Sequence, residues 1–170
     1  ALLIVLSSRG LQLLLNPIAA FALFVGSSYL VYFTPVFDVL VRYHWGHVVM
    51  SVLFLATGYL FFWVTVGIDP GPKQLPFLAR LGLLFAVMPF HAFFGIALMT
   101  STTVIGESFY SQLQLPWNPD LLSDQRLGGG IAWAAGEIPL VLVMLALLVQ
   151  WSRQDQRQAT RFDRREDRDH

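Results

Sequence analysis

Residues 43–68, YHWGHVVMSVLFLATGYLFFWVTVGI, include no Asp, Glu, Lys or Arg at any of their 26 positions. A helix needs about 20 apolar residues to cross a bilayer core. Two further uncharged runs, residues 10–37 and 81–106, have 28 and 26 positions, and the apolar run 131–151 contains a single acid. The sequence therefore predicts an all-α polytopic membrane helix bundle with four transmembrane helices, near 11–33, 45–67, 80–105 and 129–151.

The composition supports a lipid bilayer as the surroundings of this chain. Of the 170 residues, 55% are hydrophobic and 13% are charged, whereas soluble domains have roughly 25% charged residues. The 11 basic and 11 acidic residues balance, so there is no basic field for binding nucleic acid. The absence of cysteine excludes disulfides, iron-sulfur clusters and thiolate zinc sites.

The charges divide the chain into three parts and orient it. Residues 1–10 read as the end of a preceding helix and a cytoplasmic turn, 11–151 as the transmembrane domain, and 152–170 as a charged cytoplasmic tail that is either a solvated helix extension or disordered. With four spans, nine Lys and Arg residues lie on one side and two on the other, which predicts that both ends are cytoplasmic. The loops 34–44 and 106–128 then face outward. We expect the chain to be the C-terminal part of a larger polytopic protein.

Histidine and methionine recur at helical spacing near the predicted outer surface. His44, His47 and Met50 follow one another every three residues at the start of the second span. In the third span, Met88, His91, Gly95 and Met99 fall within an arc of about 80°. Because Met99 lies at a depth comparable to His47 and Met50, we expect His44, His47, Met50 and Met99 to converge.

Such a set suits copper, because imidazole and thioether bind it without a thiolate and thioether favours Cu(I). Methionine in an apolar helix also serves simply as packing, and a histidine at a span boundary also binds water or a carbonyl. Both interpretations remain open at the level of sequence.

Two ionisable residues are predicted within the membrane. His91 is near the middle of its span, where such a side chain normally faces the bundle interior and marks a pathway or a site. Glu137 is the acid of the fourth span and precedes Pro139. It either pairs with histidine, binds metal or relays protons, or it is a neutral acid that donates to a carbonyl freed by Pro139.

The most distinctive segment is DQRLGGGIAW, residues 124–133. Asp124 is suited to cap a helix, and the glycines allow a neighbouring backbone or ligand to approach closely. The lysine and the preceding strand of a phosphate-binding loop are missing, which excludes a nucleotide site.

Asp124, Gln125, Gly128, Gly129 and Trp133, with Tyr110 before them, resemble the signature of the CtaG-like family of cytochrome c oxidase assembly factors, which are polytopic bacterial membrane proteins. His44, His47 and His91 match histidines of that family. The resemblance implies that these four spans are the C-terminal part of a seven-helix unit in the bacterial inner membrane. It is closest to actinobacterial members, which are often fused to a CopD-like copper-resistance membrane domain. Ala132 stands where many relatives have Met.

The resemblance implies assembly of cytochrome c oxidase, with its subunits as partners and delivery of copper on the outer face. Our first hypothesis is thus a non-enzymatic factor that holds copper at a His/Met site. Three alternatives remain: a copper permease with a path through His91 and Glu137, a haem protein with His47 and His91 as axial ligands, and a scaffold that binds no metal.

Overall fold

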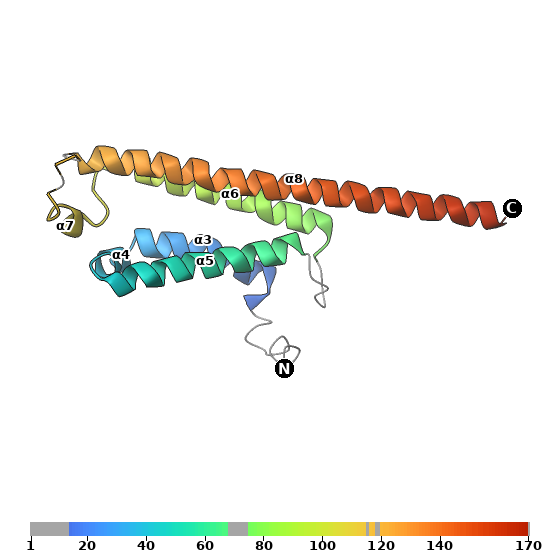
Figure 1. Ribbon diagram of the computed structural model, residues 1–170, viewed down its shortest axis with the longest axis horizontal. Helices are drawn as coiled ribbons and strands as arrows, with labels where there is room; N and C mark the ends of the chain where they lie inside the picture. The colour runs from blue at the N-terminus through green and yellow to red at the C-terminus, as the bar shows by residue number, and fades with distance from the viewer. Residues whose placement is uncertain (1–13, 68–74, 115, 118–119, 170) are drawn as a thin grey trace.

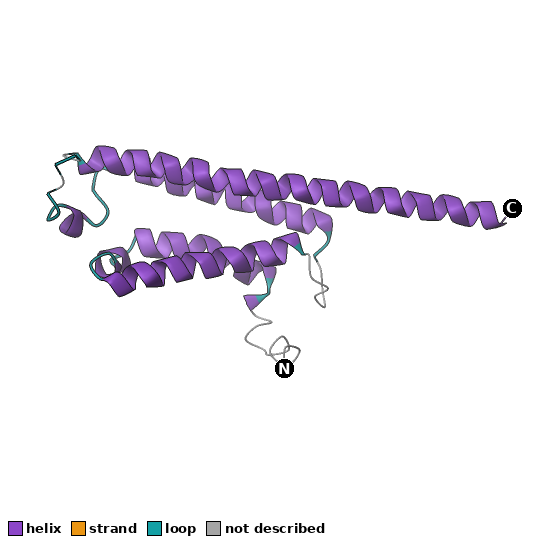
Figure 2. Cartoon of the chain, viewed as in Figure 1, coloured by secondary structure: helices purple, strands orange, loops and turns teal. Residues whose placement is uncertain are grey.

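A computed structural model describes residues 14–67, 75–114, 116–117 and 120–169, and these residues form helices and loops but no strand (Figure 2). The predicted end of a preceding helix, residues 1–10, lies outside the described residues. The helices are α3 (Pro17–Tyr32), α4 (Val36–Leu40), α5 (His44–Val66), α6 (Phe77–Thr100), α7 (Glu107–Tyr110) and α8 (Leu121–Asp169).

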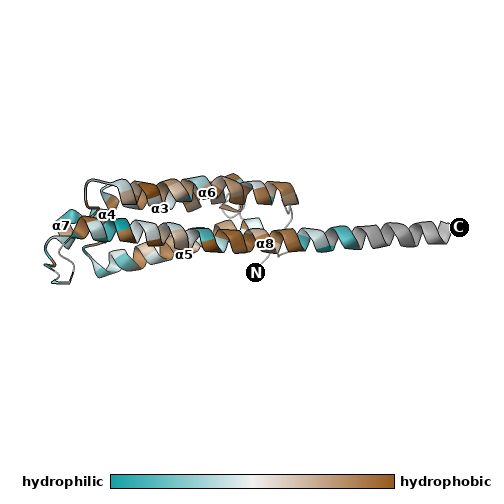
Figure 3. Ribbon diagram, turned by 90° about the horizontal axis from the view of Figure 1, so that it is seen from above, coloured by the Kyte–Doolittle hydropathy of each residue, from teal (hydrophilic) through white to brown (hydrophobic). Residues whose placement is uncertain are grey.

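The predicted membrane helix bundle is confirmed. Three of the described helices are long and apolar enough to cross a bilayer: α5, α6 and the part of α8 from Leu121 to Arg153. The fourth, α3, is a shorter apolar helix of 16 residues. Apolar residues predominate along the bundle, and more polar ones gather around α7 and where α8 leaves the bundle (Figure 3).

The beginning of α3 is set by an asparagine cap and a proline. The Asn16 side-chain oxygen accepts hydrogen bonds from the backbone N–H of Ile18 at 2.9 Å and of Ala19 at 3.4 Å. Pro17 therefore occupies the first helical position, where a missing N–H has no consequence. The helix starts at Pro17 because its cap and its proline both favour a start there.

The beginning of α8 corrects the expectation that Asp124 caps this helix. The cap is Asp120, whose Oδ1 accepts from the N–H of Leu122 at 3.1 Å and of Ser123 at 3.0 Å. Asp124 lies inside the first turn, where its negative charge is favoured by the helix dipole. At its other end α8 continues through the charged tail to Asp169, so the tail is a helical extension.

The three spanning helices and α3 form two antiparallel pairs, α3 with α5 and α6 with α8, and α3 joins the pairs through α6 (Figure 1). Both short helices and the first turns of α5 and α8 gather at one end of the bundle, here called the α4–α7 end. At the opposite end α5 stops, α6 begins and α8 runs on. The described residues of the segments predicted as outward loops, 34–44 and 106–128, lie at the α4–α7 end, where α8 already begins at Leu121.

Two apolar clusters stabilise the bundle. The one near the α4–α7 end comprises Val31, Phe37, Leu40, Val41 and Met50. The second joins α5, α6 and α8 through Phe61, Leu84, Val87, Leu140 and Leu147. Phe24 of α3 stacks on Phe61 of α5, with ring centroids 4.9 Å apart, so the second cluster involves α3 as well as the three spanning helices.

A buried arginine ties three helices together at the opposite end. Arg80 of α6 is only 4% exposed, and its Nη1 donates to the Val66 carbonyl of α5 at 3.0 Å and to Gln150 Oε1 of α8 at 3.2 Å. Next to it, Phe77 of α6 stacks on Trp151 of α8. Arg80 thereby satisfies a carbonyl at the C-terminus of α5, which would otherwise have no helical partner.

Candidate functional site

The α4–α5 corner positions the predicted histidine pair. Gly46 is buried in the first turn of α5, and a Cβ there would collide with the Leu40 carbonyl oxygen and with Leu40 C and Cα. Only glycine therefore allows α4 and α5 to approach this closely. His44 and His47 lie on either side of Gly46 in the chain, so the corner that requires glycine also fixes their backbone positions.

Both histidine side chains of this corner are exposed. They are three residues apart on α5, which places them about one turn apart on neighbouring sides of the helix. Among the described residues, neither imidazole has a hydrogen-bond or ion-pair partner within the chain. The pair therefore presents ring nitrogens that are available to an external ligand.

Met50, the third member of the predicted stripe, faces inward. It is 8% exposed and belongs to the apolar cluster of Val31, Phe37, Leu40 and Val41. Its thioether packs beneath the corner, whereas the two imidazoles lie on the surface of it.

A polar network beside the corner joins α4 to α7. Arg42 Nη2 donates to Ser108 Oγ at 2.8 Å, and Ser108 Oγ donates to Asp38 Oδ1 at 3.2 Å. Phe109 and Tyr110 pack against the apolar cluster that contains Met50. Burial, and secondarily the negative charge of Asp124, raise the pKa of Tyr110 above its ordinary value. The loop after α6 is thus fastened across the α4–α7 end.

Met99 lies at a different interface, between α6 and α8. A Cβ added at Gly129 would lie 2.8 Å from Leu98 Cβ, 3.1 Å from Met99 Cγ and 3.2 Å from the Gly95 carbonyl oxygen. The relation is reciprocal, because a Cβ added at Gly95 would lie 3.3 Å from the Gly129 carbonyl oxygen and 2.6 Å from Trp133 Cβ. Small residues at such crossings let transmembrane helices pack closely. We call this contact the α6–α8 joint.

Gln125 closes the joint at the end of α6. Its side-chain oxygen accepts from the Ile105 N–H at 2.7 Å, and its amide nitrogen donates to the carbonyls of Leu98 at 3.4 Å and Thr103 at 3.1 Å. Carbonyls in the last turn of a helix have no intrahelical partner. Gln125 thus satisfies backbone groups where α6 gives way to its loop.

Packing between α6 and α8 therefore explains part of the distinctive segment 124–133. Gln125 and Gly129 form the joint, Trp133 packs on Gly95, and Gly130 lies near the Met99 sulfur. Gly128 differs, because a Cβ added there would meet no atom within 4 Å. Asp124 is exposed on the same turn as Gly128.

His91 also contacts α8. Its Nε2 lies 3.1 Å from the Ala132 carbonyl oxygen, and since a carbonyl only accepts, Nε2 is the protonated nitrogen. A Cβ added at Gly136 would collide with the His91 ring. Gly136 is thus the residue that admits His91 between α6 and α8, seven residues after Gly129.

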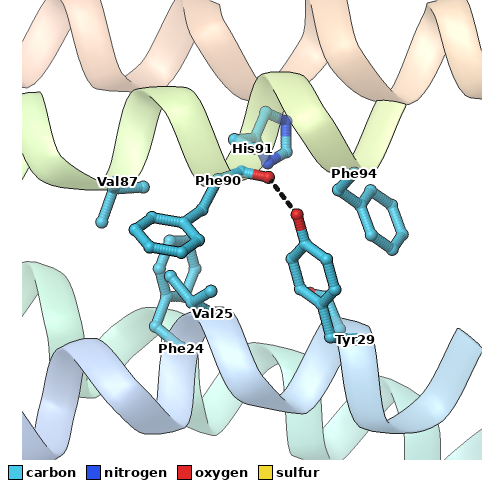
Figure 4. A pocket seen from close by; sticks show the side chains of 8 residues that line it. Phe24, Val25, Tyr29, Val87, Phe90, His91 and Phe94 are labelled. Carbon is cyan, nitrogen blue, oxygen red and sulfur yellow. Dashed lines mark hydrogen bonds between the residues drawn. The ribbon is translucent and has the colours of Figure 1, made fainter. Parts of the chain in front are cut away.

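The other side of His91 borders a small cavity between α3 and α6 (Figure 4). Its volume is about 30 Å³, and its polar lining comes from Ser28, Tyr29 and His91. The Tyr29 hydroxyl donates to the Phe90 carbonyl at 2.7 Å across it. A water needs roughly 10–15 Å³, and small-molecule pockets usually exceed about 300 Å³, so this cavity suits water and not an organic ligand.

The remaining predicted residues occupy separate places. Glu137 is partly buried on α8, and Met88 packs against the second apolar cluster. The described residues hold no group of three or more His, Cys, Asp or Glu side chains that could share a metal ion. His44 and His47 are thus exposed and three residues apart on α5, whereas Met50, Met99 and His91 lie in three other packing environments.

We did not predict from the sequence the residues that position the histidine side chains. Gly46 carried a signal, since it stands between the two histidines, and so did Gly136, since it repeats Gly129 after two helical turns. The Asp38, Ser108 and Arg42 network carried none, because its members are far apart in the chain.

Comparison with known proteins identifies the family that the sequence resembles. Residues 1–154 match the model of a family described as cytochrome c oxidase caa3 assembly factor. An uncharacterized protein of Mycobacterium bovis is 58% identical over 165 residues, which is 97% of this chain and 25% of that protein. An uncharacterized protein of Mycobacterium leprae is 60% identical over 152 residues, 89% of this chain and 23% of that protein. The chain thus spans about a quarter of the length of these relatives. No solved structure matches the chain.

Proposed function

Since the chain belongs to the cytochrome c oxidase caa3 assembly factor family, we propose that it takes part in oxidase assembly by presenting copper to oxidase subunits at the histidine pair of the α4–α5 corner. In this proposal copper is cargo that is bound and passed on. The α4–α7 end faces outward from the bacterial inner membrane, and the opposite end, with its arginine-rich extension, faces the cytoplasm. The protein acts as a carrier and not as an enzyme.

The observation that carries the proposal is the exposed, unpartnered state of the His44 and His47 imidazoles within the described residues. Neutral imidazole nitrogens bind copper well and need no thiolate. A pair of donors leaves coordination positions open, and a recipient site can enter those positions. The corner is fixed by Gly46 and by the network of Asp38, Ser108 and Arg42, so the donors are held on a rigid support.

The two imidazoles are exposed, whereas the two methionine side chains lie in packing contacts. Met50 packs in the apolar cluster under the corner, and Met99 packs on Gly129 and Gly130. Bringing either thioether to the histidine pair would disrupt a close-packed contact. We therefore assign the cargo to His44 and His47 and treat both methionines as packing residues.

Anaerobic Cu(I) titration of the detergent-purified chain against a chromophoric chelator tests this assignment. We expect stoichiometric binding by the wild type and by the control His91→Gln. The variant His44→Ala/His47→Ala should lose binding by at least about tenfold, equivalent to about 1.4 kcal/mol. Undiminished binding in that double variant contradicts the assignment.

A scaffold that binds no metal is the second candidate, and the α6–α8 joint favours it. The most distinctive segment of the sequence makes backbone and glycine contacts that need no metal. Oxidase activity in cells that carry each variant in the full-length protein separates the two. Normal oxidase in the double histidine variant, with loss in a joint variant, supports the scaffold.

A further inference from the structure

The last part of α8 is a helix that leaves the bundle. From Ser152 to Asp169 it continues the axis of the transmembrane part without a break (Figure 1). At about 1.5 Å per residue it extends roughly 25 Å beyond Trp151. We call these residues the α8 extension. Their backbone places each charged position at a defined angle around the helix.

The charges of the α8 extension are segregated around the helix. At about 100° per residue, all six arginine positions fall within an arc of about 120°, and all five acidic positions fall within a separate arc of about 160°. The basic arc comprises positions 153, 157, 161, 164, 165 and 168, and the acidic arc comprises positions 155, 163, 166, 167 and 169.

This segregation places like charges at the spacings that are neighbours on a helix. Arginine is followed by arginine three or four residues later at 153/157, 157/161, 161/164, 161/165, 164/168 and 165/168. Acid is followed by acid at 163/166, 163/167 and 166/169, whereas arginine is followed by acid at 164/167 and 165/169. Each like pair destabilises a helix by a few tenths of a kcal/mol. An external surface of complementary charge would relieve that repulsion.

We infer that the α8 extension associates side by side with the α8 extension of a second copy of this chain, the basic arc of one against the acidic arc of the other. Copies in one membrane share an orientation, so their extensions run parallel at the same height. Arginine positions 153, 161, 164 and 165 each have an acidic position two residues later. Parallel neighbours therefore match charge with charge at a stagger of about 3 Å.

A second copy is the partner that the charges favour over an anionic membrane surface. The extension continues the direction of the transmembrane helix (Figure 1), so most of its arginine positions lie away from the bilayer that α8 spans. Lipid phosphates would also neutralise only the basic arc. A second copy meets both arcs. Because one arc contacts the other, the association is heterologous and extends into a ring or a row.

Energy transfer between labelled copies, measured at low and high salt, tests this association. The full chain has no cysteine, so Thr160→Cys, at a position between the two arcs, accepts a single dye. Energy transfer between donor- and acceptor-labelled copies is measured in phosphatidylcholine vesicles. We expect transfer that falls at least about threefold when NaCl rises from about 50 to about 500 mM, because salt screens exposed charges.

Two variants, each with the charge of one arc reversed, test whether the association depends on opposite charges. Replacing all six arginines of the basic arc by Glu makes both arcs acidic, and replacing all five acids of the acidic arc by Arg makes both arcs basic. Each should lose transfer with itself and regain it when the two are mixed, while the neutral control Gln154→Ala/Gln158→Ala keeps wild-type transfer. Circular dichroism checks that the helix persists in each variant.

Several outcomes overturn the inference. They are absence of transfer in the wild type, equal transfer by each reversed variant alone, and failure of the mixture to restore transfer. Salt-sensitive dye protection that appears only in vesicles with anionic lipid assigns the basic arc to the membrane and overturns it too.

Discussion

The α6–α8 joint and the α4–α5 corner lie near the same end of the bundle and treat their key residues in opposite ways. The joint engages Gln125 and Gly129 of the most distinctive segment in contacts with α6. The corner instead uses a buried glycine to hold two exposed histidines. The segment 124–133 thus supplies packing contacts between α6 and α8, whereas His44 and His47 keep ring nitrogens that are exposed to an external ligand.

Substitution at neighbouring glycines should give the largest contrast. Gly129→Val forces a branched side chain into Leu98, Met99 and the Gly95 backbone, and overpacking of this kind costs about 3 kcal/mol or more. Gly128→Val, one residue earlier, meets open space and should change stability by less than about 1 kcal/mol. Thermal unfolding in detergent measures both. Equal losses would show that α6 and α8 do not meet at Gly129.

Removing the glutamine should weaken the joint by a smaller amount. Gln125→Ala leaves the Ile105 N–H and the Leu98 and Thr103 carbonyls without this partner, and we expect a loss of about 2 kcal/mol in unfolding free energy. The control Gln112→Ala removes a local bond to Ser108 on an exposed side chain and should stay within about 0.5 kcal/mol. A Gln125→Ala protein as stable as the wild type contradicts this role.

Removing the two histidines of the corner should weaken copper binding and leave the free energy of unfolding almost unchanged. Because both side chains are exposed, His44→Ala/His47→Ala should unfold within about 0.5 kcal/mol of the wild type. Chemical unfolding of the metal-free protein measures this, with Met50→Ala as the comparison, since that change empties a buried site at about 2–5 kcal/mol. A large loss in the histidine variant would indicate buried contacts for the pair.

The smallest effect concerns Tyr110 of α7, whose pKa responds to the charge of Asp124. Burial and Asp124 raise the pKa of Tyr110, so the neutral phenol is favoured in the folded chain. This contribution to stability is complete below the unfolded pKa and is lost as the pH rises through the raised value. Asp124→Asn should lower the Tyr110 pKa by removing the second cause. Ultraviolet titration of tyrosinate absorbance, with Tyr110→Phe to assign the signal, measures the change. An unchanged Tyr110 pKa in this variant would show that the charge of Asp124 does not act on Tyr110.

The spans could be predicted from the sequence because exclusion of charge from lipid leaves long uncharged runs, such as residues 43–68. Their ends could not, because caps decide them. Asn16 and Asp120 accept from N–H groups two and three residues ahead, and nothing in the periodicity distinguishes Asp120 from Asp124. Helical spacing identified His44 and His47 as a pair. It could not show that Met50, one turn further, faces the apolar cluster.

The convergence of Met99 with the histidine pair depended on which helices are neighbours, and spacing within one helix carries no such information. Gly95 and Gly129 settle that question, because α6 packs on α8 where both residues lack a side chain. The same contact gives Met99 its neighbours on α8.

The most direct test of the separation between donors and packing residues is X-ray absorption at the copper edge of the Cu(I)-loaded chain. The account predicts a first shell with the scattering of imidazole nitrogen and without sulfur, which disappears in His44→Ala/His47→Ala. A shell that contains thioether sulfur would contradict it, because Met50 or Met99 would then have to leave its packing contact to bind the metal.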